Sequence, residues 1–161
     1  MRILGMLLLI LSCGGLGASR VLELKRDIKD SEELLRALDR MEIEICGKHR
    51  TLPETAALLH LEFPRCFEGL GDISDTIRDR SFGEIWQEHF HTCGLAEETE
   101  KAMCVLGADL SAGMRPETAF ENCRRDLKAA CRTRMEALER NGRVYIVSGF
   151  AAGLLLMIAI L

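Results

Sequence analysis

The segment His89-Phe90-His91-Thr92-Cys93 contains the residue types that bind zinc or activate a thiol. On a helix, His89 and Cys93 are four residues apart and share a face, whereas His91 does not lie on that face. No second ligand pair follows at the spacing of a zinc finger, so further ligands would have to come from other elements. We therefore expect no metal and no other cofactor.

Cysteine, histidine and aspartate could form a nucleophilic triad on paper, but the motifs that position a catalytic group are missing from the sequence. It contains no G-x-S-x-G, no H-E-x-x-H and no phosphate-binding loop. An enzyme built on His89, His91 or Cys93 would need bound zinc or a thiol pKa far below normal. We expect no enzymatic activity.

Two carboxylates, Glu42 and Glu44, lie beside core positions in Met41-Glu-Ile-Glu-Ile45, at the end of the first predicted helix. Charges in such places usually form only a solvated face. A role in binding a partner is the alternative interpretation.

The elements that must position these residues are all helical. Apolar residues recur at intervals of three, four and seven, no strand-like alternation occurs, and the chain has only three prolines. Capping boxes at Thr51–Glu54 and Ser81–Glu84 start two of the helices. The pattern predicts an all-α antiparallel six-helix bundle with helices over 21–46, 51–61, 64–77, 81–92, 95–110 and from 116 onward. The third of these helices should be broken near residues 69–72.

The charged residues lie in the middle of the chain. Residues 3–19 and 144–161 carry no charge, and as helices they would reach roughly 25 to 27 Å, just enough to cross a hydrocarbon core of about 30 Å. This pattern predicts an N-terminal transmembrane helix (1–20), a helical domain (21–143) and a C-terminal transmembrane helix (144–161). Between Arg20 and Arg143, 20 Lys and Arg are mixed with 25 Asp and Glu, which excludes nucleic-acid binding.

Small residues in both apolar segments predict close helix packing. Gly149 and Gly153 form G-x-x-x-G, and Gly14 with Ala18 forms a second pair at the same spacing. Glycine and alanine are also common in membrane helices generally. The packing could occur within one chain or between copies, which would form a homo-oligomer.

Basic residues near the two apolar segments lie mostly on the domain side, which favours a cytoplasmic domain with both termini outside. The alternative is an exported or lipid-anchored helical binding domain, since Gly17-Ala18-Ser19 suits a signal-peptide cleavage site and Cys13 an acylation site. On that alternative the six other cysteines would pair as disulfides. Their spacing among apolar helical positions instead predicts free, mostly buried thiols.

Several segments together resemble a known family. The stretch from Leu35 to Ile45, the turn from Gly47 and the segment Thr51-Leu-Pro-Glu-Thr-Ala56 are similar to the "L-x-x-L-E-x-E-I…G-x-T-P-L-x-x-A" pattern of stage III sporulation protein AB. The similarity continues with Ser81-Phe-Gly-Glu-Ile-Trp86, with Leu106-Gly107 at the family's "L-G" turn, and with the closing segment from Ser148 to Leu156.

The resemblance implies a membrane protein of the mother cell in endospore-forming bacteria, part of the channel assembly that links it to the forespore. The family's cytoplasmic domain is similar to that of the type II secretion inner-membrane platform protein. The chain would then be a scaffold that docks a cytoplasmic secretion-type ATPase, stage III sporulation protein AA-like, and contacts other channel components. Glu42 and Glu44 fall on the family's acidic helix end and are the candidates for the ATPase-facing surface.

The first apolar segment distinguishes the retained anchor from the cleaved leader. We predict that mass spectrometry of the purified protein finds a chain that begins at Met1 or Arg2, because the segment remains as a membrane helix. A mature chain that begins after residues 17–19, or one that carries a lipid on Cys13, would contradict this prediction.

Overall fold

The computed structural model describes residues 2–71, 73 and 80–160. In residues 2–17 and in much of 143–160 it describes the backbone but not the side chains. The described part contains no strand, and the prediction of an all-helical chain is therefore confirmed.

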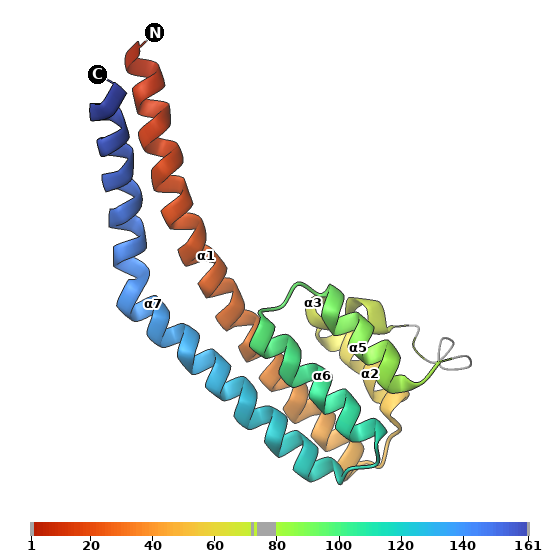
Figure 1. The fold of residues 1–161 in the computed structure, drawn as a ribbon. Helices are drawn as coiled ribbons and strands as arrows, with labels where there is room; N and C mark the ends of the chain where they lie inside the picture. Colours follow the sequence, from red (N-terminus) through yellow and green to blue (C-terminus); the bar gives the residue numbers. More distant parts are fainter. Residues whose placement is uncertain (1, 72, 74–79, 161) are drawn as a thin grey trace. The chain divides into compact units, whose positions relative to one another are not determined.

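Six α-helices are present among these residues, together with two short helices of other types (Figure 1). The α-helices are α1 (Arg2–Glu42), α2 (Leu52–Glu62), α3 (Pro64–Phe67), α5 (Phe82–Thr92), α6 (Glu97–Ser111) and α7 (Pro116–Ile160). A π-helical turn, η1 (Ile43–Gly47), follows α1 directly, and a 3₁₀ turn, η2 (Glu68–Leu70), follows α3.

Both predicted capping boxes are present. The Thr51 amide donates a hydrogen bond to Glu54 Oε2 (3.2 Å) at the start of α2. At the start of α5, the Ser81 amide donates to Glu84 Oε2 (3.2 Å) and the Glu84 amide donates to Ser81 Oγ (3.3 Å). Each box satisfies amides that have no partner inside the helix, and this local chemistry explains why these two helices begin where the sequence predicts.

Two details of the prediction were wrong. The first helix stops being α-helical at Glu42 rather than at residue 46, because the chain continues as η1. Leu106-Gly107 lies inside α6 and not at the turn that the resemblance implies, in agreement with the helix predicted over 95–110. The α-helical part of the third helix ends at Phe67 and η2 follows, close to the break predicted near residues 69–72, whereas residues 72 and 74–77 lie outside the described residues.

Contacts divide the chain into two compact units. Unit 1 contains residues 1–28 and 132–161, and unit 2 contains residues 29–131. The domain boundaries that we predict at residues 20 and 143 are not tested by this division. Among the described residues, no helix combines the length and the apolar character needed to cross a membrane. The side chains of both predicted spans lie largely outside that part, so the spans stay predictions.

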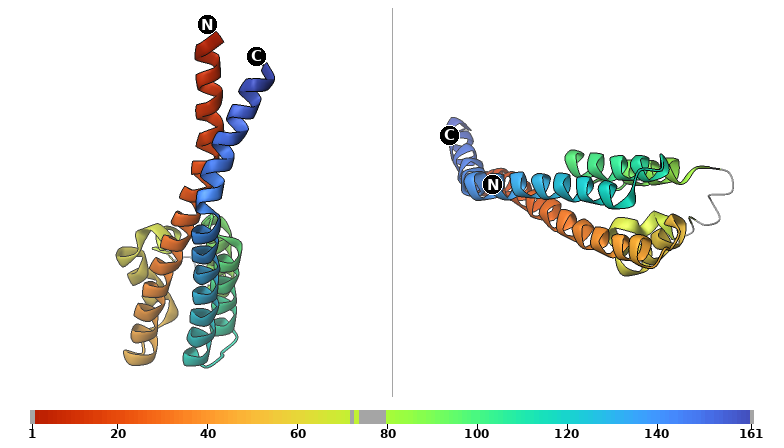
Figure 2. Two further views of the ribbon diagram at one scale, coloured as in Figure 1. Left: turned by 90° about the vertical axis from the view of Figure 1, so that its left-hand side faces the viewer. Right: turned by 90° about the horizontal axis from the view of Figure 1, so that it is seen from below.

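Unit 2 is built in two halves that share one core. In both views of Figure 2, α2 and α3 lie beside α1, and α6 lies beside α7. Ion pairs join α1 to α2 and α3, and the Cys123 thiol of α7 donates a hydrogen bond to the Ala102 carbonyl of α6 (3.5 Å). The buried positions of α7 in this unit include Phe120, Cys123, Leu127 and Cys131, the face that the sequence predicts for the last helix.

Trp86 of α5 is fully buried at the centre of this core. Its ring centroid lies 4.9 Å from that of Phe90, 5.3 Å from Phe82 and 6.0 Å from Phe67. The indole Nε1 donates a hydrogen bond to the Met103 carbonyl of α6 (2.7 Å), which satisfies its only donor in the interior.

Gly107 of α6 allows Trp86 to approach this closely. A Cβ atom at position 107 would lie 2.2 Å from Trp86 Cδ1, well inside van der Waals contact. The glycine therefore costs helix propensity in α6 but makes room for the largest side chain of the core.

We predict that Gly107→Ala destabilises the protein by about 1 to 3 kcal/mol, because the indole must move and lose its hydrogen bond and ring contacts. Denaturant unfolding of the full chain measures the loss. The matched control is Gly47→Ala, where a Cβ meets nothing within 4 Å and φ is not positive. An unchanged stability of Gly107→Ala would show that the core is loosely packed around Trp86.

Candidate functional site

The histidine and cysteine residues at the end of α5 lie on two different faces, as their spacing on a helix predicts. His89 Nε2 lies 2.8 Å from the Cys66 carbonyl oxygen and 3.1 Å from Cys93 Sγ. Because a carbonyl oxygen only accepts, Nε2 carries the proton and donates a hydrogen bond to the Cys66 carbonyl. His91 is exposed and contacts Glu100 of α6, with 2.5 Å between Nδ1 and Oε1. The structure thus brings His89 and Cys93 together and leaves His91 apart.

Burial lowers the reactivity of His89 and Cys93. It raises the pKa of the Cys93 thiol to about 11 and lowers the pKa of His89. At neutral pH the cysteine is therefore a protonated thiol beside a neutral imidazole, whereas a nucleophilic cysteine needs the opposite shift. Among the described side chains, no group of three or more histidine, cysteine or acidic residues is placed to hold a metal ion.

The six described cysteines are all free thiols, namely Cys46, Cys66, Cys93, Cys104, Cys123 and Cys131. Burial raises the pKa of both Cys66 and Cys123 to about 12, so these thiols pack as small apolar side chains. The disulfides that an exported domain would contain are not formed between these six residues.

Glu44 is the most deeply buried carboxylate in the described part of the chain, with 1% of its surface exposed. Three cations surround it. Lys48 Nζ donates a hydrogen bond to Oε1 (2.7 Å), Arg40 Nη1 lies 3.2 Å from Oε1, and Arg50 Nε lies 3.2 Å from Oε2. The hydrogen bond from Lys48, together with the charges of Lys48, Arg40 and Arg50, lowers the pKa of Glu44 although burial opposes the shift. The carboxylate is therefore ionised inside the protein.

Local backbone geometry brings these cations together. The π-helical turn η1 follows α1 at the point where Glu44 turns inward, and His49 in the loop after it has a positive φ of 54°. This reversal places Lys48 and Arg50 on either side of one carboxylate, and the Arg50 amide also donates to the Glu44 carbonyl (3.0 Å). Arg40 continues the network to Glu62 of α2 (3.0 Å). One buried charge thus fixes α1, η1 and α2 to one another.

Glu42 belongs to a second network, which joins α1 to α7. Arg124 Nη2 of α7 lies 2.5 Å from Glu42 Oε2 and 2.8 Å from Asp39 Oδ1. Hydrogen bonds to these two carboxylates raise the pKa of Arg124. Both predicted partner-binding residues, Glu42 and Glu44, are therefore already engaged in ion pairs inside the chain. Their role toward a partner is not tested by these contacts and stays a prediction.

The sequence analysis did not identify the inward position of Glu44, although a signal was present. Glu44 follows Met41 by three residues and therefore continues the core stripe of Leu34, Leu38 and Met41. Arg40 lies four residues before Glu44, and Lys48 and Arg50 lie four and six residues after it. A carboxylate on a core stripe with this many neighbouring cations is typical of a buried ion-pair network.

The four small residues predicted to pack in the membrane are only partly described. Ala18 lies on α1 and is exposed, whereas Gly14, Gly149 and Gly153 lie outside the residues whose surroundings the structure describes. Their packing therefore stays a prediction.

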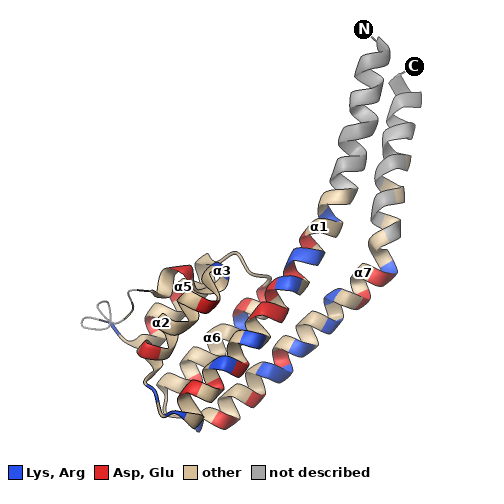
Figure 3. Cartoon of the chain, turned by 180° about the vertical axis from the view of Figure 1, so that it is seen from behind, with Lys and Arg blue, Asp and Glu red and all other residues tan. Residues whose placement is uncertain are grey.

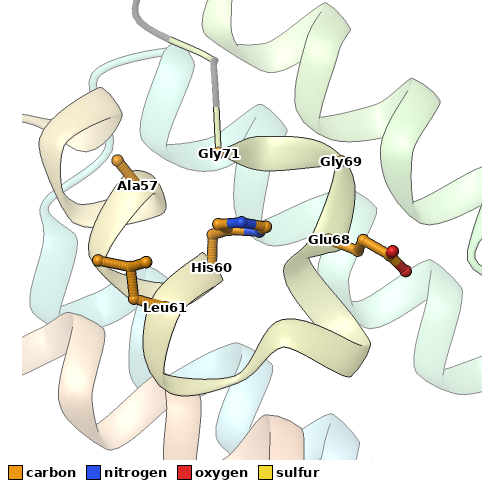
Figure 4. A pocket seen from close by; sticks show the side chains of 6 residues that line it. All are labelled: Ala57, His60, Leu61, Glu68, Gly69 and Gly71. Carbon is orange, nitrogen blue, oxygen red and sulfur yellow. The ribbon is translucent and has the colours of Figure 1, made fainter.

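A hollow on the surface of unit 2 lies between α2 and the α3–η2 segment (Figure 4). It is lined by Ala57, His60, Leu61, Glu68, Gly69 and Gly71. His60 Nδ1 lies 3.0 Å from the Phe67 carbonyl and donates to it, so the imidazole holds the two walls together. A Cβ at Gly71 would lie 2.9 Å from His60 Cδ2. The sequence analysis did not single out these residues, and they form a structural contact.

We predict that Glu44→Gln lowers the stability of the protein at neutral pH and flattens its acid dependence. A carboxyl group whose pKa is lowered by folding stabilises the folded state above its unfolded pKa, which is about 4.3, and that stabilisation is lost as pH falls through the folded value. The urea midpoints of wild type and variant should therefore differ fully above about pH 5 and approach each other as the pH falls below about 4 toward the lowered folded pKa. Glu121→Gln, at an exposed position on α7, is the control and should follow the wild type throughout. Parallel curves for wild type and Glu44→Gln would contradict the assignment.

Comparison with known proteins agrees with these observations. The family model described as stage III sporulation protein AB matches residues 2–161. No curated protein and no solved structure matches the chain. The family match covers the charged helical middle, with both ion-pair networks, and both apolar ends. The chain therefore belongs to the stage III sporulation protein AB family.

Proposed function

We propose that this protein is a non-enzymatic membrane scaffold of the sporulation channel that links mother cell and forespore. Family membership over residues 2–161 supports a role in sporulation and is the observation that carries this proposal. On this proposal the protein holds other channel components in place and docks a cytoplasmic secretion-type ATPase, stage III sporulation protein AA-like.

The proposed architecture is an antiparallel six-helix bundle between two transmembrane helices. Residues 1–20 and 144–161 would span the mother-cell membrane around the forespore, with the bundle in the cytoplasm and both termini outside. The lack of charge in 3–19 and 144–161 supports the spans, and the basic residues that flank them on the domain side support the orientation. Gly14, Ala18, Gly149 and Gly153 would form the close contacts between membrane helices, within one chain or between two copies.

The chemistry of the described side chains favours a scaffold over an enzyme. The imidazole of His89 and the thiol of Cys93 lie in contact as a neutral ring and a protonated thiol. The ring donates a hydrogen bond to the backbone carbonyl of Cys66. The buried carboxylate Glu44 forms ion pairs with three cations. Polar groups of this kind position helices and offer no unpaired acid, base or nucleophile to a substrate.

We further propose that Glu42 and Glu44 act in ATPase docking through the cations that they hold. Glu44 itself is buried, but Arg40, Lys48 and Arg50 around it are each at least one-third exposed. We call these three residues the cationic corner. These three cations face two carboxylates, Glu44 and Glu62, so the corner keeps an excess of one positive charge. The rest of unit 2 is acidic, with 13 Lys and Arg against 21 Asp and Glu in the whole unit, and the corner therefore suits an acidic surface of the ATPase. Glu42 forms an ion pair with Arg124 of α7 and so positions a further cation.

Two variants in one background test this docking surface. Glu44→Gln removes the buried charge but leaves the three cations, whereas the triple variant Glu44→Gln, Lys48→Gln, Arg50→Gln also removes two of the cations that a partner would contact. We predict that the triple variant loses at least about tenfold in ATPase affinity in co-purification and titration, and that Glu44→Gln alone loses much less. Circular dichroism of both variants checks that the helical fold is retained.

The opposite results have distinct meanings. An equal loss in both variants would show that the cations at positions 48 and 50 are not themselves the contact, and that only the structure maintained by the buried charge of Glu44 matters for binding. Unchanged binding in the triple variant would remove the cationic corner from the interface.

A further inference from the structure

Charge is divided unequally between the two units. Unit 1 carries eight Lys and Arg against four Asp and Glu, a net charge of +4, whereas unit 2 carries 13 against 21, a net charge of −8. The chain as a whole is slightly acidic, with a net charge of −4. Unit 1 is therefore a basic segment of an acidic protein, and its partner should differ in chemistry from the partners of unit 2.

Most of the described basic residues of unit 1 are exposed, and four of them lie within about two helical turns of the apolar ends. Figure 3 shows Lys and Arg on both α1 and α7 near the grey terminal segments. The exposed basic residues are Arg20, Lys25, Arg26, Arg132 and Arg140, whereas Arg134 is mostly buried and pairs with Asp27 (3.6 Å) between α7 and α1. The two helices thus present their cations within one unit, and Arg134 helps to hold them together.

Two of these exposed cations form ion pairs with exposed carboxylates, and two form none among the described residues. Arg20 pairs with Glu23 and Arg132 with Glu136, each at 2.8 Å between two exposed groups of the same helix. Exposed pairs of this kind contribute about 0 to 1 kcal/mol and exchange readily for another anion. Lys25 and Arg140 have no ion-pair partner among the described residues. The positive charge is therefore available to a ligand.

Exposed aliphatic side chains lie among these cations. Leu22 on α1 is 65% exposed, and Val144 and Val147 on α7 are 59% and 66% exposed. Water is a poor environment for such side chains, but the boundary between lipid headgroups and acyl chains suits both them and the neighbouring cations. An acidic protein or a nucleic acid would match the charges and leave the aliphatic groups without an apolar environment.

We propose that unit 1 binds the anionic headgroups of phospholipids through a basic collar formed by Arg20, Lys25, Arg26 and Arg140, with Leu22, Val144 and Val147 inserted at the acyl boundary. The phosphate and its neighbours accept hydrogen bonds from the cations, and the aliphatic side chains leave water. This inference rests on the proposed membrane anchoring, and it adds a preference for lipid charge that anchoring alone does not require.

Spin-labelled lipids test the collar on the full chain. The protein is reconstituted into phosphatidylcholine vesicles that contain either spin-labelled phosphatidylglycerol or spin-labelled phosphatidylcholine, and electron spin resonance measures how much of each label the protein immobilises. We expect phosphatidylglycerol to be preferred by about three- to fivefold at low salt, and the preference to decline in about 0.5 M salt because the charges are screened.

The variant Lys25→Gln with Arg140→Gln should lower this preference to less than about half of the wild-type value, since two unpaired cations are removed. Lys101→Gln is the matched control, because Lys101 is an exposed lysine of α6 in unit 2 and its loss should leave the preference unchanged.

The outcomes separate this inference from the proposed function. Immobilisation of both labels to the same extent would overturn the collar and leave the membrane scaffold intact. Immobilisation of neither label would show that the chain is not embedded in the bilayer, and would overturn both. A preference that survives in the double variant and in high salt would show that the collar residues do not provide it.

Discussion

The packing of Trp86 against α6 is the contact around which the described core is organised. An indole can be fully buried only if its N–H finds an acceptor and its faces find partners. Met103 supplies the acceptor, three phenylalanine rings surround the indole, and Gly107 leaves the space that any side chain would fill. This arrangement fixes the separation of α5 and α6. It also sets the place of α5, which carries His89 and ends at Cys93, against the Cys66 carbonyl of α3.

A second constraint acts at the end of α1, where a charge is placed in the interior. A buried carboxylate is tolerated only when its charge is compensated, and Glu44 is compensated three times. The compensation also determines the outer surface, because each cation that turns inward to reach Glu44 keeps part of its side chain in water. The same cations therefore compensate the buried carboxylate and contribute positive charge to the surface. For this reason the docking role proposed for Glu42 and Glu44 is indirect and acts through the cations that they pair with.

The helices and their starts could be predicted from sequence because their determinants are local. The boxes at Thr51 and Ser81 act within one helical turn, and the apolar stripe of α7 is visible as a spacing. The end of α1 was not predictable in this way, because a π-helical turn adds a residue to the helical repeat and shifts the faces that follow. The packing role of Gly107 was not predictable either, because its reason, the indole of Trp86, comes from another helix. The role of His60 was missed for the same cause, since its acceptor on Phe67 is reached only after the chain has folded back.

The π-helical turn η1 has a consequence for changes in chain length. The hydrogen-bond register changes at η1, which contains Glu44. A π-helical turn takes up about one more residue than an α-helical turn. Deletion of one residue from this turn would therefore rotate the segment with Lys48 and Arg50 relative to α1 and separate these cations from the carboxylate that they compensate.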